Sequence, residues 1–451
     1  MKKLLIIIVM LGALISCKKV LDQKPQASLD ASTAFSTRQA IEAGIIGVYD
    51  GLQSGNYYGI DYTLLGGVGA DELNHTGTFP SYLEIKNRAI QTNNANITST
   101  YNQIYVVINR ANTVLSNALT NTDPNFPKNA SLGELRFLRG FAYFDLLRYY
   151  GGTPEGYNKP NGVGVSLVLT PTLTAPDAAP KPRSTEAEVL TQILSDLDFA
   201  IANLPTTSAN GRVNKNVALG IKARVQLYRE DFNDAENLST QIISQFSTQA
   251  RGGLAADYAS LYSSKNTKPE SLFELQYNST DAGSLRFYYY GREEVSSSVS
   301  LGNAHEAGDL RKPVNYNAFG SRFKTMKYSR PDNSDNILLL RLAEIYLIRA
   351  EARARKATPD LAGAIADLNI VRNRAGLANT TAVTAGDLFD AILRERRVEL
   401  AHEAHRWFDL RRTNRLISTL GITEAFRALW PIPQREVDNS GGIVKQNPGY
   451  N

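Results

Sequence analysis

GIKARVQLYREDFNDA at 220–235 and RAEARARKATPDLAGA at 349–364 repeat one pattern in two distant parts of the chain. Each segment places an Ala-Arg pair seven residues before an Asp-apolar-x-x-Ala motif, which begins at Asp231 in the first and at Asp360 in the second. A helix, a tight turn and a second helix account for this pattern, because small residues let two helices approach closely where they cross. The two segments therefore predict two helical hairpins.

Helical hairpins of this kind resemble tetratricopeptide units, which stack side by side into a helical-repeat scaffold. ELRFLRGFAYFDLLRYYGG at 134–152 is apolar around most of its girth, which predicts a helix sandwiched between neighbours. Helical spacing of apolar residues also follows two predicted capping boxes, Ser36 with Gln39 and Thr185 with Glu188. We therefore expect a mainly α fold.

Two long stretches interrupt the helical pattern, at about 55–95 and about 250–333. The first is rich in Gly, Asn, Thr and Tyr, and the second contains the strand-like LFELQY at 272–277, so we expect ordered, partly β insertions. Asp335 or Asn336 is expected to cap the helix that follows the second insertion. We treat 35–451 as one domain, whose Pro-, Gly- and Asn-rich tail from about 430 packs as an extended wrap.

The N-terminus has the features of a bacterial lipoprotein signal. Lys2 and Lys3 precede an apolar run of about twelve residues, which is too short to span a bilayer and is typical of a signal-peptide core. The run ends in LISC at 14–17, which resembles a lipobox, and Cys17 is the single cysteine of the chain. We therefore expect residues 1–16 to be a signal peptide, Cys17 to be lipidated and 17–34 to form a tether to the membrane.

The composition argues against several other classes of protein. The chain has 451 residues, of which 43% are hydrophobic and 21% charged, so a disordered or multi-spanning membrane protein is excluded. The formal net charge of +5 is small and no basic stripe is present in the sequence, so we expect no nucleic-acid partner.

No local motif indicates catalysis, a cofactor or a metal. HEAH at 402–405 spaces its histidines by three residues rather than the four that a zinc-protease helix requires, so we interpret it as part of a packed helix over 392–412. In that helix Asp409 can pair with Arg406 or Arg412. GGVG at 66–69 lacks the spacing of a nucleotide loop, and no Gly-x-Ser-x-Gly elbow occurs. Glycosidase carboxylate pairs leave no local signature, so a hydrolase stays open at this point.

Several strings together resemble the SusD/RagB-like family of outer-membrane nutrient-binding lipoproteins. They are LRFLRGFAYFDLLRYYGGTP (135–154), LLLRLAEIYLIRAEAR (338–353), LNIVRNRAGL (368–377), RERRVELAHEAHRWFDLRR (394–412), and PIPQREVDN with QNPGY (431–439, 446–450). One departure is Ala404, which stands where the family often has glycine. The resemblance covers nearly the whole chain and includes the lipobox.

The resemblance implies about four tetratricopeptide-like helix pairs, with a ligand site built by the insertions. It also implies capture of an oligosaccharide without hydrolysis, a SusC-like TonB-dependent transporter as partner, and a lipid-anchored place on the outer membrane facing the exterior. Two alternatives from other classes are a glycoside hydrolase and a helical-repeat adaptor lipoprotein that binds a protein or peptide.

The ligand site is expected in the insertions, at about 55–95 and 278–296. Sugar rings present apolar C–H faces and a rim of hydroxyls, so a site needs exposed aromatic rings beside polar side chains. The candidates are Tyr57, Tyr58, Asp71, Asn74, His75, Phe79, Tyr82, Arg286, Tyr288, Tyr289, Tyr290, Arg292 and Glu293. If 288–290 is a strand, Tyr289 should face away from Tyr288 and Tyr290.

Overall fold

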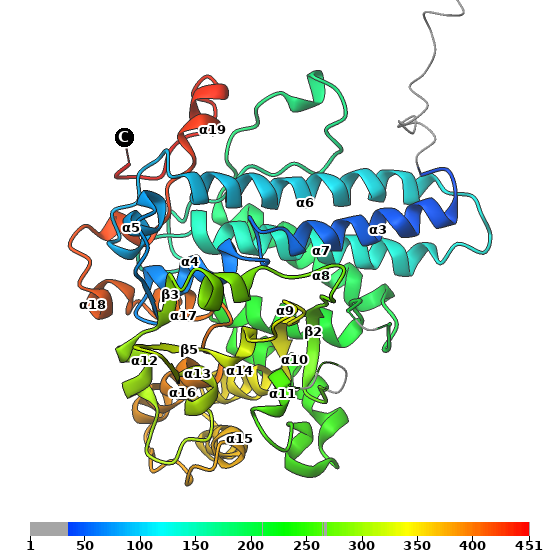
Figure 1. Ribbon diagram of the computed structural model, residues 1–451. Coiled ribbons are helices and arrows are strands. Elements are labelled where there is room, and N and C mark those ends of the chain that lie inside the picture. The colour runs from blue at the N-terminus through cyan, green and yellow to red at the C-terminus, as the bar shows by residue number, and fades with distance from the viewer. Residues whose placement is uncertain (1–34, 210, 264, 266–267, 451) are drawn as a thin grey trace, which may run out of the picture.

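The computed structural model describes residues 35–209, 211–263, 265 and 268–450, and helices dominate it (Figure 1). The signal peptide, Cys17 and the tether lie outside the described residues. The α-helices are α3 (Arg38–Gln53), α4 (Asp61–Gly69), α5 (Pro80–Lys86), α6 (Ala95–Thr120), α7 (Lys128–Tyr150), α8 (Glu186–Asn203), α9 (Lys215–Tyr228), α10 (Phe232–Ile243), α11 (Ser260–Ser263), α12 (Val299–Ala304), α13 (Lys312–Asn315), α14 (Leu342–Arg355), α15 (Leu361–Arg374), α16 (Ala385–Glu399), α17 (Arg406–Arg412), α18 (Leu416–Leu420) and α19 (Gln434–Asn439).

The remaining elements are short. A π-helical turn, η4, spans Phe287–Gly291, and 3₁₀ turns are η1 (Pro176–Ala178), η2 (Ser244–Phe246), η3 (Ala250–Gly253), η5 (Met326–Tyr328) and η6 (Ala425–Ala428). The strands are β1 (Leu73–His75), β2 (Ser271–Leu275), β3 (Val295–Ser297), β4 (Asn317–Phe319), β5 (Arg322–Lys324) and β6 (Ile337–Arg341). They form three two-stranded antiparallel ladders, β1 with β3, β2 with β6 and β4 with β5.

The helical-repeat scaffold predicted from the sequence is confirmed. Its four helix pairs are α3 with α6, α7 with α8, α9 with α10 and α14 with α15, and successive pairs also touch one another. The segments 220–235 and 349–364 form the α9–α10 and α14–α15 hairpins, with Ala235 and Ala364 buried where the helices meet. In Figure 1 the long α3, α6 and α7 lie side by side above the shorter pairs.

Side-chain caps mark the start of several helices. Thr185 and Glu188 form the expected capping box of α8, with the Thr185 N–H donating to Glu188 Oε2 at 2.8 Å. The first helix begins one residue later than expected, because Thr37 rather than Ser36 accepts the capping bond, from Ala40 N–H at 3.1 Å. As predicted, α7 is buried on nearly all sides. Trp407 and Trp430 also lie in the core. None of the described helices combines the length and hydrophobicity that a membrane crossing requires.

Two predictions at the end of the second insertion and beyond it were wrong. Asp335 and Asn336 cap no helix, because β6 follows them and Asn336 Oδ1 accepts the Tyr277 N–H at 3.0 Å. The stretch 392–412 is not one helix, because α16 ends at Glu399 and α17 begins at Arg406. Between them His402 and Ala404 have φ angles of 65° and 60°, a left-handed conformation that helical periodicity does not reveal.

The end of α16 and the loop that follows it are held by a group of buried ion pairs. Glu399 Oε1 accepts from Arg341 at 2.9 Å and from Arg374, and Glu399 Oε2 accepts from Arg311 at 3.0 Å. Burial alone would raise the pKa of Glu399, but these three guanidinium groups hold it far below its ordinary value. The ion pairs join α16 to the second insertion through Arg311, to β6 through Arg341 and to α15 through Arg374.

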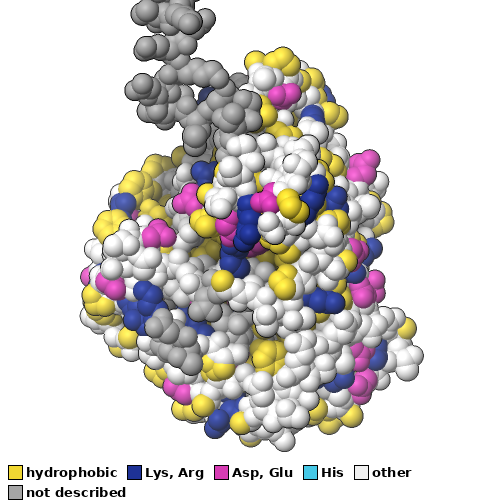
Figure 2. Space-filling model, turned by 90° about the vertical axis from the view of Figure 1, so that its right-hand side faces the viewer, with side chains coloured by type: hydrophobic (Ala, Val, Ile, Leu, Met, Phe, Trp, Pro, Cys, Tyr) yellow, Lys and Arg dark blue, Asp and Glu magenta, His cyan; other side chains and the backbone are white. Residues whose placement is uncertain are grey.

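The basic and acidic side chains are interspersed on the face shown in Figure 2, which is the right-hand side of Figure 1. Lys and Arg side chains lie there next to Asp and Glu, rather than in a continuous basic stripe across the described part of that face.

We predict that Glu399→Gln lowers the free energy of unfolding by about 3–5 kcal/mol, because it removes the one carboxylate that Arg311, Arg341 and Arg374 share inside the core. Urea denaturation followed by circular dichroism measures the effect. The matched control is Glu424→Gln, which removes the exposed partner of Arg427 and should cost less than about 1 kcal/mol. Equal, small losses in both variants would contradict the structural role of Glu399.

Ala404→Gly should have the opposite effect on stability. Glycine removes the strain of a Cβ at φ 60°, roughly 1–2 kcal/mol, which exceeds the loss of one buried methyl at about 0.8 kcal/mol. We therefore expect the free energy of unfolding to rise by up to about 1 kcal/mol. Ala401→Gly, in the same loop and without a positive φ, should lower it, and a loss in both variants would refute the explanation.

Candidate ligand-binding surface

The two insertions meet in the structure through a short antiparallel ladder. Strand β1 of the first insertion pairs with β3 of the second, with Leu73 opposite Ser297 and His75 opposite Val295. Helix α5 follows β1, and the π-helical turn η4 precedes β3. Residues about 220 positions apart in the sequence are thereby brought onto one face, where α5, β3 and β5 lie on the left of Figure 1.

The segment 287–291 is a π-helical turn and not the strand expected from the sequence. The Arg292 N–H donates to the Phe287 carbonyl at 2.7 Å, which closes the wide turn. Tyr289 is fully buried in a stack with Tyr328, whereas Phe287 is 51% exposed and Tyr288 and Tyr290 are partly exposed. Tyr289 therefore does face away from its neighbours, but because of the turn and not because of a pleat. Single π turns of this kind are frequent at functional sites.

These elements build a surface that we call the aromatic patch. It consists of Phe79, Phe287, Tyr288, Tyr290 and Phe319. The ring centroids of Phe287 and Tyr288 are 6.0 Å apart, and those of Tyr290 and Phe319 are 5.1 Å apart, both pairs edge to face. Phe79 and Phe319 are 42% and 40% exposed, so the patch presents ring faces to solvent.

Charged side chains separate and surround the rings. The Arg292 guanidinium lies 4.3 Å from the centroid of Phe79 and 6.0 Å from that of Tyr288, and it pairs with Glu294 at 2.9 Å. Lys324 Nζ lies 3.7 Å from the Phe319 centroid and 3.4 Å from Glu293. The two cations thus lie over one face of Phe79 and one face of Phe319, so the patch combines partly exposed rings with charged groups beside them, which suits a sugar ring with its hydroxyls.

A stack of buried aromatic rings, which we call the base of the patch, supports the aromatic patch from beneath. Tyr82 is buried with its ring 4.8 Å from His75 on one side and 6.2 Å from Tyr288 on the other. The Tyr82 hydroxyl donates to Asp61 at 3.3 Å. Burial raises the pKa of Asp61 to about 7 and lowers the pKa of His75, so neither group favours its charged form near neutrality. The base is thus a neutral, packed support.

The structure places the predicted site residues in four different positions. Phe79, Arg286, Tyr288, Tyr290, Arg292 and Glu293 lie in or beside the patch, and Asn74, His75 and Tyr82 lie beneath it. Tyr57, Tyr58 and Tyr289 lie in the core, where Tyr57 donates to Asp145 and its ring stacks on Tyr58 at 4.8 Å, so these three present no ring to a ligand. Asp71 accepts from Arg406 at 2.6 Å and pairs with Arg397 at 2.9 Å on another side of β1.

Two patch residues, Phe287 and Phe319, and two charged neighbours of the patch, Glu294 and Lys324, were missing from the sequence-based candidates. Phe319 and Lys324 belong to the β4–β5 hairpin, whose turn contains Gly320 at φ 58°. The signal was present in NAFGSRFK at 317–324, where a Gly-containing turn separates two short strand-like pieces, each with a Phe. The side-by-side placement of this hairpin and η4 has no local signal, because it depends on tertiary packing.

Comparison with known proteins gives consistent matches. A sequence model of the SusD family matches residues 258–419, and one described as starch-binding associating with outer membrane matches residues 19–227. SusD-like protein P38 of Formosa agariphila is 27% identical, with 99% of this chain and 98% of the relative covered. A SusD-like protein of Bacteroides ovatus is 24% identical, with coverage of 86% and 78%.

Solved structures share the fold. A SusD superfamily protein of Bacteroides vulgatus superposes with a TM-score of 0.79 at 24% identity, covering 92% of this chain and 99% of that one. A laminarin-binding SusD-like protein superposes with a TM-score of 0.76 at 22% identity, covering 91% and 99%. Family matches over both halves of the chain and relatives aligned along most of its length support membership in the SusD/RagB-like family.

Proposed function

We propose that this protein captures oligosaccharides on the aromatic patch, without hydrolysing them, and delivers them to a TonB-dependent transporter of the outer membrane. The observation that carries the proposal is the set of exposed rings flanked by Arg292, Glu294, Lys324 and Glu293 where the two insertions meet. Aromatic faces of this kind stack on the C–H faces of sugars, and the charged edges bond hydroxyl groups.

The family supports a carbohydrate as the ligand class. One matching family model is described as starch-binding, and one structural neighbour is described as laminarin-binding. Both descriptions concern glucose polymers, so starch and laminarin oligosaccharides are the first ligands to test. Capture without turnover fits a patch that lies open on the surface, because hydrolysis needs two carboxylates that flank a bound glycosidic bond at a separation of about 5–9 Å.

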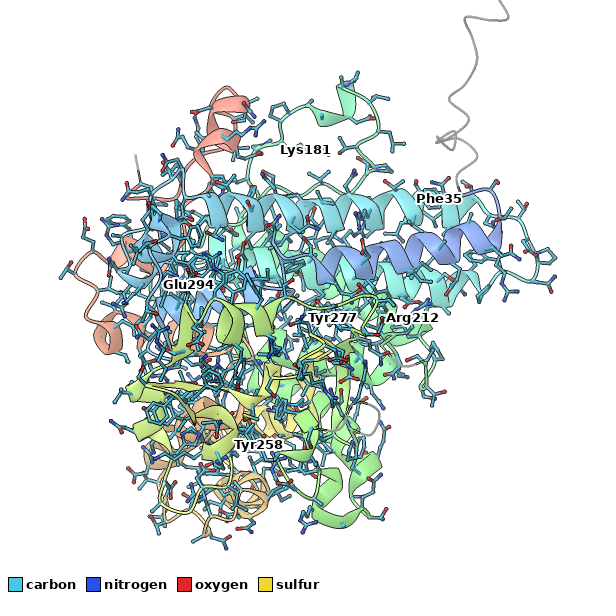
Figure 3. The ribbon with its side chains drawn as sticks, viewed as in Figure 1. Phe35, Lys181, Arg212, Tyr258, Tyr277 and Glu294 are labelled. Carbon is cyan, nitrogen blue, oxygen red and sulfur yellow. The ribbon has the colours of Figure 1, made fainter. Side chains whose placement is uncertain are left out.

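The proposed location is the outer membrane, through a lipid on Cys17. The description of the family model that matches residues 19–227 includes association with the outer membrane. In Figure 3 Phe35, where the described chain begins, and Glu294 of the patch region lie on opposite sides of the view. A protein tethered through the segment before Phe35 would therefore hold the patch away from its point of attachment.

Phe79→Ala should weaken binding of laminarin or starch oligosaccharides about five- to tenfold, because one stacking ring is worth about 1–1.5 kcal/mol. Isothermal titration calorimetry on the mature protein measures the affinity. The control is Phe199→Ala, since Phe199 also carries an arginine over its ring, Arg136 at 4.2 Å, but lies on α8 outside the patch. Unchanged affinity in Phe79→Ala and in Tyr288→Ala, with the fold intact, would remove the patch from the site.

Incubation of the wild-type protein with these oligosaccharides separates the three candidate classes, which are a capture protein, a glycoside hydrolase and a helical-repeat adaptor. Saturable binding with intact oligosaccharide recovered supports capture, whereas release of shorter products would show a hydrolase. Absence of binding to every glycan, together with retention of a protein partner, would favour the adaptor.

Cys17→Ala should release the protein from the membrane fraction, because acyl chains on Cys17 are the proposed anchor. Fractionation of producing cells measures the release, and mass spectrometry of the wild-type N-terminus measures acylation. The lipid anchor would be disproved if Cys17→Ala stayed in the membrane fraction and the wild-type N-terminus carried no acyl group.

A further inference from the structure

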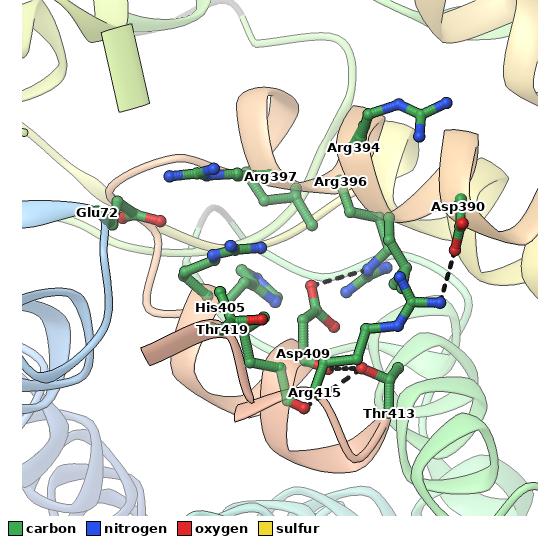
Figure 4. A pocket seen from close by; sticks show the side chains of 14 residues that line it. Glu72, Asp390, Arg394, Arg396, Arg397, His405, Asp409, Thr413, Arg415 and Thr419 are labelled. Atoms are coloured by element: carbon green, nitrogen blue, oxygen red, sulfur yellow. Dashed lines mark hydrogen bonds and ion pairs between the residues drawn. The ribbon is translucent and has the colours of Figure 1, made fainter. Parts of the chain in front are cut away.

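A cavity of about 210 Å³ lies between α16, α17 and α18, apart from the aromatic patch. Its wall is rich in arginine, as Figure 4 shows, and Glu72 closes it on the side of β1. The lining residues that matter for its chemistry are Arg394, Arg396, Arg397, His405, Arg406, Asp409 and Arg415.

Several donors in this wall have no partner among the described residues. Arg396 is 1% exposed, and although its Nε donates to Asp409 at 2.9 Å, neither Nη1 nor Nη2 is hydrogen-bonded within the described chain. The same holds for Arg397 Nε and for His405 Nδ1. A buried charged donor without an acceptor costs about 1–3 kcal/mol or more, so a wall with several such donors indicates an acceptor that the chain itself does not supply.

The charge around the cavity is positive. Arg396, Arg397, Arg406 and Arg415 pair with three carboxylates, Asp409, Asp71 and Asp390, and Asp409 is also shared with Arg412. Arg394 adds a further positive charge at the rim, where Figure 4 shows it turned outward.

Two titratable groups of the wall do not cancel this excess. Burial raises the pKa of Glu72 to about 7, which weakens its negative charge near neutrality. Burial lowers the pKa of His405 to about 3, so its ring is neutral and can donate through one nitrogen only.

We propose that this cavity binds a small oxyanion, either as a free inorganic ion or as the acidic group of a charged sugar. Guanidinium groups present several donors in a fixed plane, which matches the oxygens of carboxylate, sulfate or phosphate. The volume holds several water molecules at about 30 Å³ each, so it accommodates such a group. The bound anion would accept from Arg396 on α16 and from His405 Nδ1 at the start of α17, and would so join the two helices.

Titration calorimetry on the mature protein tests the site with sodium sulfate, sodium phosphate and sodium glucuronate, at constant ionic strength made up with chloride. We expect saturable binding of at least one of them. Arg415→Gln should weaken it about three- to tenfold, because Arg415 lines the cavity and is the most exposed of its ion-paired arginines. Arg110→Gln is the matched control, because Arg110 is similarly exposed and similarly paired with an aspartate but lies on α6.

Arg396→Gln gives a second test at the centre of the wall. Its melting temperature without anion decides whether it folds, and the rise in melting temperature that the anion causes in the wild type should be lost in a folded variant.

Preference for glucuronate over the inorganic ions identifies an acidic sugar as the source, and the reverse preference identifies a free ion. No saturable binding of any of the three, or equal affinity in wild type, Arg415→Gln and Arg110→Gln, would overturn the proposal. Binding of laminarin and starch oligosaccharides at the aromatic patch is measured independently, so the two sites can fail separately.

Discussion

Glu399 is the carboxylate on which the placement of the second insertion depends. Glu399 is the last residue of α16 and is fully buried. It accepts hydrogen bonds from the guanidinium groups of Arg311, Arg341 and Arg374. A buried ion cluster of this kind can contribute little net stability, because desolvation offsets much of the attraction. The cluster nevertheless joins α15, α16, β6 and the second insertion at one buried point, and so constrains how the insertion lies on the repeats.

The loop after Glu399 carries this constraint to the ligand-binding surface. The His402 N–H donates to Glu72 at 2.7 Å, next to β1, and His402 Nε2 lies 3.0 Å from the Asn315 carbonyl. Because Nε2 donates there, Nδ1 is free to accept from the Tyr289 hydroxyl at 2.9 Å. Burial lowers the pKa of His402 to about 3, which keeps the ring neutral and this pattern of bonds intact. Tyr289 is thereby held inward, and its neighbour Tyr288 is turned toward the patch.

The sequence predicted the scaffold better than the site for a physical reason. Helix pairs depend on local apolar spacing and on caps such as Thr185, and both can be read over a few residues. The left-handed residues His402 and Ala404 and the π-helical turn at 287–291 are not preferred locally; they persist because distant partners such as Glu72 and Asn315 hold them. Burial also depends on tertiary contacts, so sequence alone could not separate Tyr57 and Tyr58 in the core from Phe79 on the surface.

The separation of the aromatic patch from the Glu399 ion pairs suggests how one scaffold serves different ligands. The patch residues Phe79, Phe287 and Phe319 lie on short turns and a hairpin, and their side chains make no contact with the Glu399 ion pairs. Substitutions there can change the ring faces and polar edges offered to a sugar without leaving a buried charge unpaired. Changes at Glu399 or its arginines cannot be made singly without that cost. The aromatic patch can therefore tolerate substitution without loss of a buried ion pair, while the ion pairs hold the second insertion on the repeats.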